Sequence, residues 1–99
     1  MTERVIVIGS GFGGLASALR ARNMGFDVTV IERLDQLGGR AQTFERDGFV
    51  FDAGPTVITA PFLFDELFEL FDRKIEDYVE ILPVTPWYRY EFNDGTHLN

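Results

Sequence analysis

The hydrophobic positions at the start of the chain fall into two short runs separated by a helical stretch. Val5–Ile8 is apolar at every position, which is typical of a strand buried on both faces of a parallel sheet. Leu15–Met24 is rich in Ala, Leu and Arg and predicts a helix, and Asp27–Glu32 predicts a second strand. Strand, helix and strand in this order predict an α/β fold that begins with a right-handed βαβ unit.

Small residues recur along one side of the predicted helix. Gly14, Ala18, Ala21 and Gly25 follow one another at steps of four, three and four residues. Residues at this spacing share a helix face, and their small size lets a helix lie close to a sheet. Gly25 is also placed to end the helix.

The middle of the chain predicts a hairpin followed by an amphipathic helix. Ala41–Arg46 and Phe49–Asp52 are extended in pattern, and the Asp-Gly pair at 47–48 is a hairpin turn signal. Thr59 is expected to cap a helix over Ala60–Phe71, with a proline in the first turn. Its apolar stripe is rich in Phe, and its polar side is acidic throughout. We expect this stripe to pack on the chain's own core, or else to meet an apolar substrate or further protein.

The last third predicts mostly extended chain. Residues 73–78 predict a turn, 79–82 a short extended segment, and Trp87–Phe92 a strand. "NDGT" predicts a second hairpin turn, and His97-Leu98 starts its return strand. The hairpin is cut within its second strand, so we expect the N-terminal fragment of a longer protein.

Composition and charge narrow the classes of function. The 99 residues carry a net charge of −7, and residues 65–99 hold most of that acid. A nucleic-acid role is disfavoured because no basic patch exists, and polybasic attraction to anionic lipid is equally unsupported. The absence of Cys excludes disulfides and thiolate chemistry, and no metal site is expected.

The glycines after the first strand carry the main candidate chemistry. Gly9, Gly11 and Gly14 form a G-x-G-x-x-G motif between a strand and a helix. The first permits a tight turn, the second lets a pyrophosphate approach the backbone, and the third lets the helix pack closely. Glu32 ends the second strand, where an acid accepts hydrogen bonds from adenosine ribose hydroxyls and disfavours a 2′-phosphate. Together they predict a Rossmann-like dinucleotide-binding unit, for which FAD and NAD are both open; a glycine turn beside a surface glutamate is the alternative.

A second glycine pair follows in the predicted loop over residues 35–40. Gly38, Gly39 and Arg40 lie past the second strand, at the carboxyl edge where ligands of such sheets bind. Two glycines allow close backbone approach, and the guanidinium is a fork-shaped donor for phosphate or carboxylate. A surface loop with a solvated arginine is the alternative interpretation.

These motifs together resemble a known family. The glycine motif, Glu32 and "GGR" resemble the flavin amine oxidase and carotenoid desaturase superfamily of FAD enzymes. "FDAGPTVIT" (51–59) and "YVEILPVTPWYRYEFNDG" (78–95) are similar to bacterial-type phytoene desaturases in particular. The likeness extends over nearly the whole chain.

The resemblance implies an FAD enzyme that removes hydrogens from a long polyene such as phytoene. It further implies a cytoplasmic protein that docks peripherally on membranes and draws an apolar substrate from lipid. Residues 1–72 would belong to the FAD-binding domain and 73–99 would begin the substrate domain, with the remainder of the chain as partner. The implied cofactor-binding residues are Gly9, Gly11, Phe12, Gly13, Gly14, Glu32, Arg33, Gly38, Gly39, Arg40, Gly54, Pro55 and Thr56. The last three would lie near the isoalloxazine.

No catalytic residue is identified from the sequence. Asp52 is a candidate base beside the "AGPT" loop, with a turn or capping role as the alternative. His97 is the only histidine and is expected at the surface. Two other functions stay open: a different oxidase of the same superfamily, such as an amine or porphyrinogen oxidase, and an inactive nucleotide-binding fragment.

Overall fold

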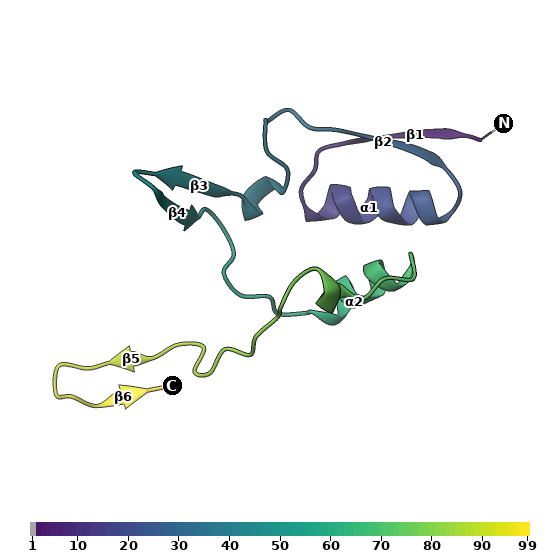
Figure 1. Cartoon of the computed structure of the whole chain (residues 1–99). Coiled ribbons are helices and arrows are strands. Elements are labelled where there is room, and N and C mark those ends of the chain that lie inside the picture. The colour runs from purple at the N-terminus through teal and green to yellow at the C-terminus, as the bar shows by residue number, and fades with distance from the viewer. Residues whose placement is uncertain (1) are drawn as a thin grey trace.

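The computed structural model describes residues 2–99, which form ten short elements in an elongated chain. Three separate two-stranded sheets are present: β1 with β2, β3 with β4, and β5 with β6. The Cα radius of gyration is 18.3 Å, compared with about 13 Å for a compact domain of 100 residues. The elements therefore meet mainly in neighbouring pairs rather than around one central core (Figure 1).

The first sheet and its helix form the predicted βαβ unit. β1 (Arg4–Ile8) and β2 (Asp27–Ile31) run parallel, and α1 (Phe12–Asn23) connects them and lies against one face of the pair (Figure 1). α1 begins three residues before the predicted start at Leu15, so Gly13 and Gly14 are part of the helix. It ends before Gly25, whose φ of 99° is the left-handed conformation expected after a helix.

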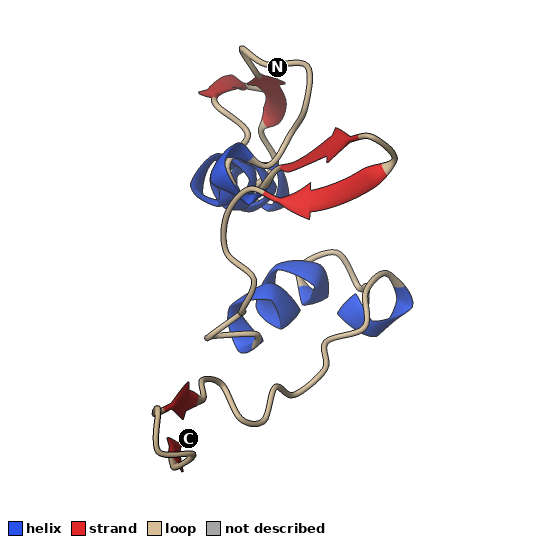
Figure 2. Cartoon of the chain, turned by 90° about the vertical axis from the view of Figure 1, so that its left-hand side faces the viewer, coloured by secondary structure: helices blue, strands red, loops and turns tan. Residues whose placement is uncertain are grey.

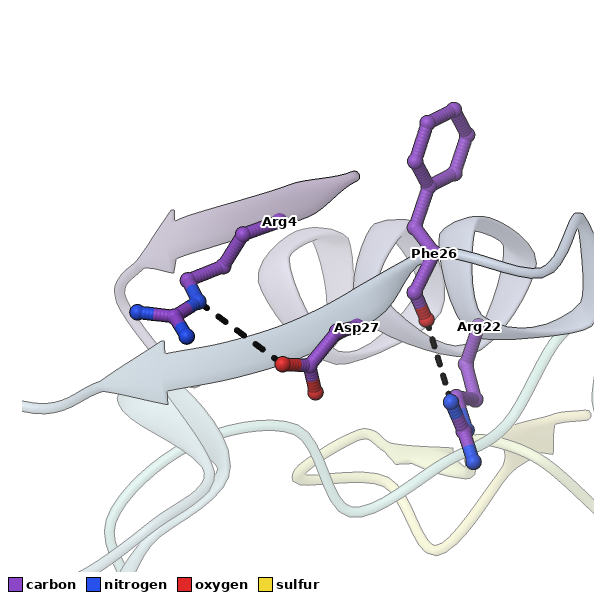
Figure 3. A network of polar contacts seen from close by, with 4 residues as sticks. All are labelled: Arg4, Arg22, Phe26 and Asp27. Atoms are coloured by element: carbon purple, nitrogen blue, oxygen red, sulfur yellow. Dashed lines mark hydrogen bonds and ion pairs between the residues drawn. The ribbon is translucent and has the colours of Figure 1, made fainter. Parts of the chain in front are cut away.

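Polar contacts tie the two strands and the end of α1 together. Arg4 Nε lies 3.7 Å from Asp27 Oδ2, and these two residues are also partners in the sheet register (Figure 3). Arg22 donates a hydrogen bond of 3.2 Å to the Phe26 carbonyl, just past the helix (Figure 3). All of these side chains are at the surface, so each pair contributes at most about 1 kcal/mol.

The expectation that Val5–Ile8 is buried on both faces is wrong for this chain. Val5 and Val7 are half-buried beneath α1, whereas Ile6 is 58% and Ile8 85% exposed. Only one helix covers the two-stranded sheet, so its other face has nothing packed against it within residues 2–99. The buried hydrophobic residues are accordingly few, namely Ala18 on the small-residue face of α1 and Ile75.

The predicted hairpin is confirmed over slightly shorter strands. β3 (Thr43–Arg46) and β4 (Phe49–Asp52) pair antiparallel around Asp47 and Gly48. Both turn residues have positive φ, 52° and 82°, as a type I′ turn requires. Ala41, predicted extended, instead ends a 3₁₀ turn, η1 (Gly39–Ala41).

The amphipathic helix is present but shorter than expected. α2 spans Phe62–Glu69, its N-cap position is Pro61, and no side chain caps it. The expectation that Thr59 caps this helix is therefore wrong: the chain enters through a turn in which Phe64 N donates to the Pro61 carbonyl at 2.9 Å. A proline in this place fits because it lacks the N–H that a cap would otherwise have to satisfy.

α2 lies next to α1, so part of its stripe packs on the chain itself (Figures 1 and 2). Phe64 meets Phe12 edge to face, with ring centroids 5.6 Å apart, and Arg20 forms a 3.0 Å ion pair with Glu66. Between the helices runs an apolar groove of about 510 Å³ that remains open. Phe62 is 65% exposed, so the stripe is only partly covered.

The C-terminal part is largely irregular. Residues 73–78 contain a 3₁₀ turn, η2 (Ile75–Asp77), and residues 79–82 form no regular element. β5 (Tyr90–Glu91) and β6 (His97–Leu98) make the second predicted hairpin, but the strand predicted over Trp87–Phe92 is reduced to two residues. None of the helices formed by residues 2–99 has the length and apolar character needed to cross a membrane.

Candidate dinucleotide site

The glycine motif forms a tight turn that leaves backbone amides free. Gly9 follows β1 with a φ of 101°, and Gly11 is the extended N-cap residue of α1 without a side-chain cap. Within residues 2–99, no hydrogen bond satisfies the amides of Phe12, Gly13 and Gly14. The first turn of α1 also carries no acidic residue. These amides and the positive end of the helix can therefore receive an anion such as a pyrophosphate.

The third glycine of the motif is held in the closest contact of the turn. A Cβ added to Gly14 would overlap the carbonyl oxygen of Gly9 and would also reach the Val7 side chain at 3.7 Å. A Cβ on the neighbouring Gly13 would meet nothing within 4 Å. Gly14 is thus needed so that the helix can close on the turn, whereas Gly13 faces open space.

Glu32 lies directly beside the glycine turn and is bound to it. Its Oε1 accepts a 2.6 Å hydrogen bond from Ser10 Oγ and a 3.1 Å hydrogen bond from Ser10 N. Its Oε2 accepts a 3.0 Å hydrogen bond from Leu34 N. These donors hold the pKa of Glu32 at about 2, with the Leu34 amide as the largest cause and the two Ser10 groups next.

The hydrogen bonds also limit what Glu32 can still accept. A carboxylate offers about four lone-pair sites, of which the chain's own donors take two on Oε1 and one on Oε2. Oε2 is therefore the oxygen with acceptor capacity left for a ligand hydroxyl. An ionised carboxylate at the end of β2 suits a ribose and repels a 2′-phosphate.

The Gly38-Gly39 loop packs backbone to backbone on the glycine turn. Gly38 N donates a 2.8 Å hydrogen bond to the Ser10 carbonyl. A Cβ added to Gly39 would come within 2.9 Å of Gly11 Cα, and Gly39 has a φ of 61°. The two glycine-rich segments, 23 or more residues apart in sequence, therefore form one continuous backbone surface beside Glu32.

The "AGPT" loop reaches the same surface at one point. A Cβ added to Gly54 would overlap the Arg40 carbonyl oxygen, and Ala53 N donates a 2.9 Å hydrogen bond to the Gln42 carbonyl. Gly54 thus lets the loop after β4 lie against the loop after β2. The Arg40 side chain itself is exposed.

The remaining predicted site residues are less closely grouped. Pro55 and the Phe12 ring line one depression of about 310 Å³, and Thr56 lines an adjoining, wider groove of about 680 Å³. Arg33 is exposed beyond the end of β2. Their contacts with a cofactor remain predictions.

The two titratable candidates outside the nucleotide site lie at the surface. Asp52 is the exposed last residue of β4 and faces Thr43 in the sheet register. His97 is exposed in β6, opposite Glu91, in the surface position expected for it.

Ser10 is the residue that sequence reasoning missed. Its side chain has no exposed surface, and through its amide, hydroxyl and carbonyl it joins the glycine turn, Glu32 and the Gly38 loop. The available signal was a hydroxyl residue at a variable position of the glycine motif, next to a helix start where small polar residues usually act as caps. Here the hydroxyl instead bonds an acid 22 residues away.

Comparison with known proteins agrees with this geometry. Residues 7–73 match the family described as an NAD(P)-binding Rossmann-like domain. The chain is 52% identical over 93 residues to a lycopene-forming phytoene desaturase of Pantoea ananas, covering 94% of this chain and 19% of the relative. It is 47% identical over 97 residues to the lycopene-forming phytoene desaturase of Pseudescherichia vulneris, covering 98% and 20%. The α/β fold class and the resemblance to phytoene desaturases are thereby confirmed.

A third relative is named for a different activity. The 4,4'-diapolycopene oxygenase of a Methylomonas species is 44% identical over 94 residues, with 95% of this chain and 19% of the relative covered. The chain therefore spans about a fifth of the length of the curated relatives that it matches. Relatives named as desaturases and a relative named as an oxygenase share this stretch of sequence, so the stretch does not distinguish between the two activities.

Proposed function

Because this chain belongs to the family of NAD(P)-binding Rossmann-like domains, we propose that it is the FAD-binding part of a flavin-dependent carotenoid desaturase. The substrate is a carotenoid precursor such as phytoene. The observation that carries the proposal is the joint placement of free helix amides, Glu32 and the Gly38-Gly39 loop on one backbone surface. Similarity to two lycopene-forming phytoene desaturases supports the choice of reaction.

In this proposal the chain's own groups bind and orient the cofactor. The amides at the start of α1 hold the pyrophosphate, since they have no partner within residues 2–99 and face no acid in the first turn. The free acceptor site of Glu32 receives an adenosine ribose hydroxyl. Gly39 and Gly54, which have no Cβ, let the loop after β2 lie against the glycine turn and the loop after β4 lie against the loop after β2.

FAD is preferred over NAD because of the "GGR" and "AGPT" segments. An NAD site requires the glycine motif and the acid, which either cofactor uses. The "GGR" loop packs on that motif, and the "AGPT" loop packs on the "GGR" loop. These two loops are the segments that resemble FAD enzymes. When bound, FAD would accept the hydride from one carbon of the bond that becomes double, and the proton from the neighbouring carbon would go to a base.

The first test is the cofactor content of the purified full-length protein. We expect flavin absorbance bands and about one FAD released per chain on denaturation. A protein without flavin bands that binds NAD instead would overturn the cofactor assignment. An inactive nucleotide-binding fragment would bind no FAD and convert no substrate.

The second test is the reaction. The full-length protein incubated with colourless phytoene should give a coloured product with a longer conjugated system and no added oxygen. A product that carries oxygen would favour the oxygenase activity for which one relative is named. No change in phytoene, with consumption of an amine or porphyrinogen, would favour another oxidase of the superfamily.

We further propose that the protein acts in the cytoplasm and at the membrane surface, where an apolar polyene is stored. Large apolar side chains lie exposed along the chain's C-terminal part, among them Trp87, Tyr88 and Phe92. The acidic balance of residues 65–99 argues for apolar rather than electrostatic contact. Co-sedimentation with neutral phosphatidylcholine vesicles should be insensitive to salt; protein that stays in the supernatant would contradict the proposal.

A further inference from the structure

One residue of the glycine turn, Ser10, supplies two of the hydrogen bonds that hold the Glu32 carboxylate. Both Ser10 groups that can donate, the amide and the hydroxyl, bond the same oxygen, Oε1, at 3.1 Å and 2.6 Å. Within residues 2–99, Leu34 N, two residues along, donates to the other oxygen, and the neighbouring Arg33 amide also favours the ionised carboxylate. The orientation of the carboxylate plane is therefore set by Ser10 on one side and by the local turn on the other.

Ser10 is itself held in place by its surroundings. Its side chain is fully buried, and its carbonyl accepts the 2.8 Å hydrogen bond from Gly38 N. The flanking residues are Gly9, with a φ of 101°, and Gly11, which packs near Gly39. A buried hydroxyl has few alternative rotamers and no water to compete for its proton, so its bond to Glu32 is well defined.

Oε2 is the oxygen of Glu32 with acceptor capacity left for a ligand. Oε1 accepts both Ser10 hydrogen bonds, whereas Oε2 accepts the one from Leu34 N. We propose that Ser10 is a positioning residue that turns the Glu32 carboxylate so that Oε2 receives the adenosine ribose of the bound dinucleotide. This rests on the proposed function of the site, and it assigns Ser10 no contact with the ligand.

The proposal separates Ser10 from the two other roles that its position allows. A residue that only stabilises the turn would affect binding of every ligand with a pyrophosphate. A hydroxyl that bound the pyrophosphate directly would do the same. A residue that acts through Glu32 affects only ligands whose adenosine ribose carries hydroxyls.

The test uses the full-length apoprotein and two ligands: FAD and an FAD analogue whose adenosine lacks both ribose hydroxyls. Dissociation constants are measured from the change in flavin fluorescence on binding. Ser10→Ala should weaken FAD binding about tenfold, as expected for one hydrogen bond to a charged group. The same substitution should change binding of the dideoxy analogue less than about twofold.

Two controls are a conservative substitution of Ser10 and the Ser10→Ala substitution made in a protein that lacks the Glu32 carboxylate. Ser10→Cys keeps nearly the same volume with a weaker donor, so it should fold and give an intermediate loss. In a Glu32→Ala protein, Ser10→Ala should cause no further loss of FAD affinity. Equal losses for FAD and the dideoxy analogue, or no loss for FAD in either Ser10 variant, would overturn the proposal.

Failure of the proposed function would look different from failure of this inference. A wild-type protein that binds no FAD refutes the cofactor assignment while leaving the adenosine site testable. The same five proteins are then titrated with NAD and with NAD lacking the hydroxyls of its adenosine ribose, with quenching of intrinsic fluorescence as the signal. The predicted pattern for Ser10 is the same, because the adenosine half is common to both dinucleotides.

Discussion

The βαβ unit and the C-terminal hairpin differ in how far each is held by its own residues. In the βαβ unit, the two parallel strands pack under α1 (Figure 1). The glycine turn after β1 buries Ser10, which donates a hydrogen bond to Glu32. In the second, β5 and β6 pair over two residues each, and every residue from 79 to 99 is exposed. The glycine turn is held by contacts with its own backbone, so its structure is defined within this short chain. The aromatic hairpin lacks such contacts and needs a further surface to pack against.

The largest effect is expected at the closest contact of the βαβ unit. Gly14→Val would place a branched side chain in the space held by the Gly9 carbonyl. We expect a loss of about 3 kcal/mol in the free energy of unfolding, with loss of cofactor binding. The measurement is urea unfolding of the full-length protein followed by circular dichroism.

Gly13→Ala is the matched control for that experiment. Its added Cβ meets nothing within 4 Å, and alanine is favoured over glycine inside a helix by roughly 0.5–1 kcal/mol. The control should therefore be as stable as the wild type or more so. Equal destabilisation by both substitutions would show that α1 does not close on the turn as described.

The next largest effect is expected at Glu32, the acid that is hydrogen-bonded to the glycine turn. Glu32→Ala removes the acceptor for the ribose and should weaken dinucleotide binding about 10- to 100-fold, as for a hydrogen bond to a charged group. Glu45→Ala, on the exposed strand β3, removes the same charge away from the site and should leave the dissociation constant unchanged. Similar losses in both would mean that net charge, rather than Glu32, governs affinity.

The pKa of Glu32 gives a smaller, pH-dependent effect. Its folded-state pKa of about 2 lies below the ordinary value of 4.5, so its stabilisation is complete above pH 4.5. It is lost as pH falls from 4.5 towards 2. The difference in melting temperature between wild type and Glu32→Gln should be constant above pH 4.5 and shrink below it. A difference that already shrinks between pH 7 and 5 would contradict the assigned hydrogen bonds.

The smallest effect is expected in the C-terminal region. Trp87 is the only tryptophan of the chain and is 61% exposed. In a protein made of these 99 residues alone, we expect its fluorescence emission to resemble that of free tryptophan and to shift little on adding urea. Emission that is blue-shifted and moves to the red on unfolding would show that this segment packs on the βαβ unit.

The sequence was informative where structure is decided locally. The βαβ order, both hairpin turns and the stop at Gly25 follow from backbone preferences of a few neighbouring residues, and all are present. The extended pattern of Trp87–Phe92 did not predict the length of the strand correctly. Strand length depends on a pairing partner, and of these residues Tyr90 and Glu91 alone are paired.

The same distinction applies to the candidate site. The glycine spacing and the acid at the end of β2 were predicted, and the structure brings them together. The contact of Ser10 with Glu32 and that of Gly54 with Arg40 could not be foreseen, because both depend on how separate loops meet in space. Likewise, no sequence pattern within the strand says that only one face of β1 is covered.

Hydrogen exchange of the full-length protein with and without FAD tests the central claim most directly. FAD is expected to slow exchange of the amides in the turn and first helical turn, residues 9–15, which have free N–H groups at Phe12, Gly13 and Gly14. Slowed exchange confined to other segments at saturating FAD, with residues 9–15 unchanged, would contradict it.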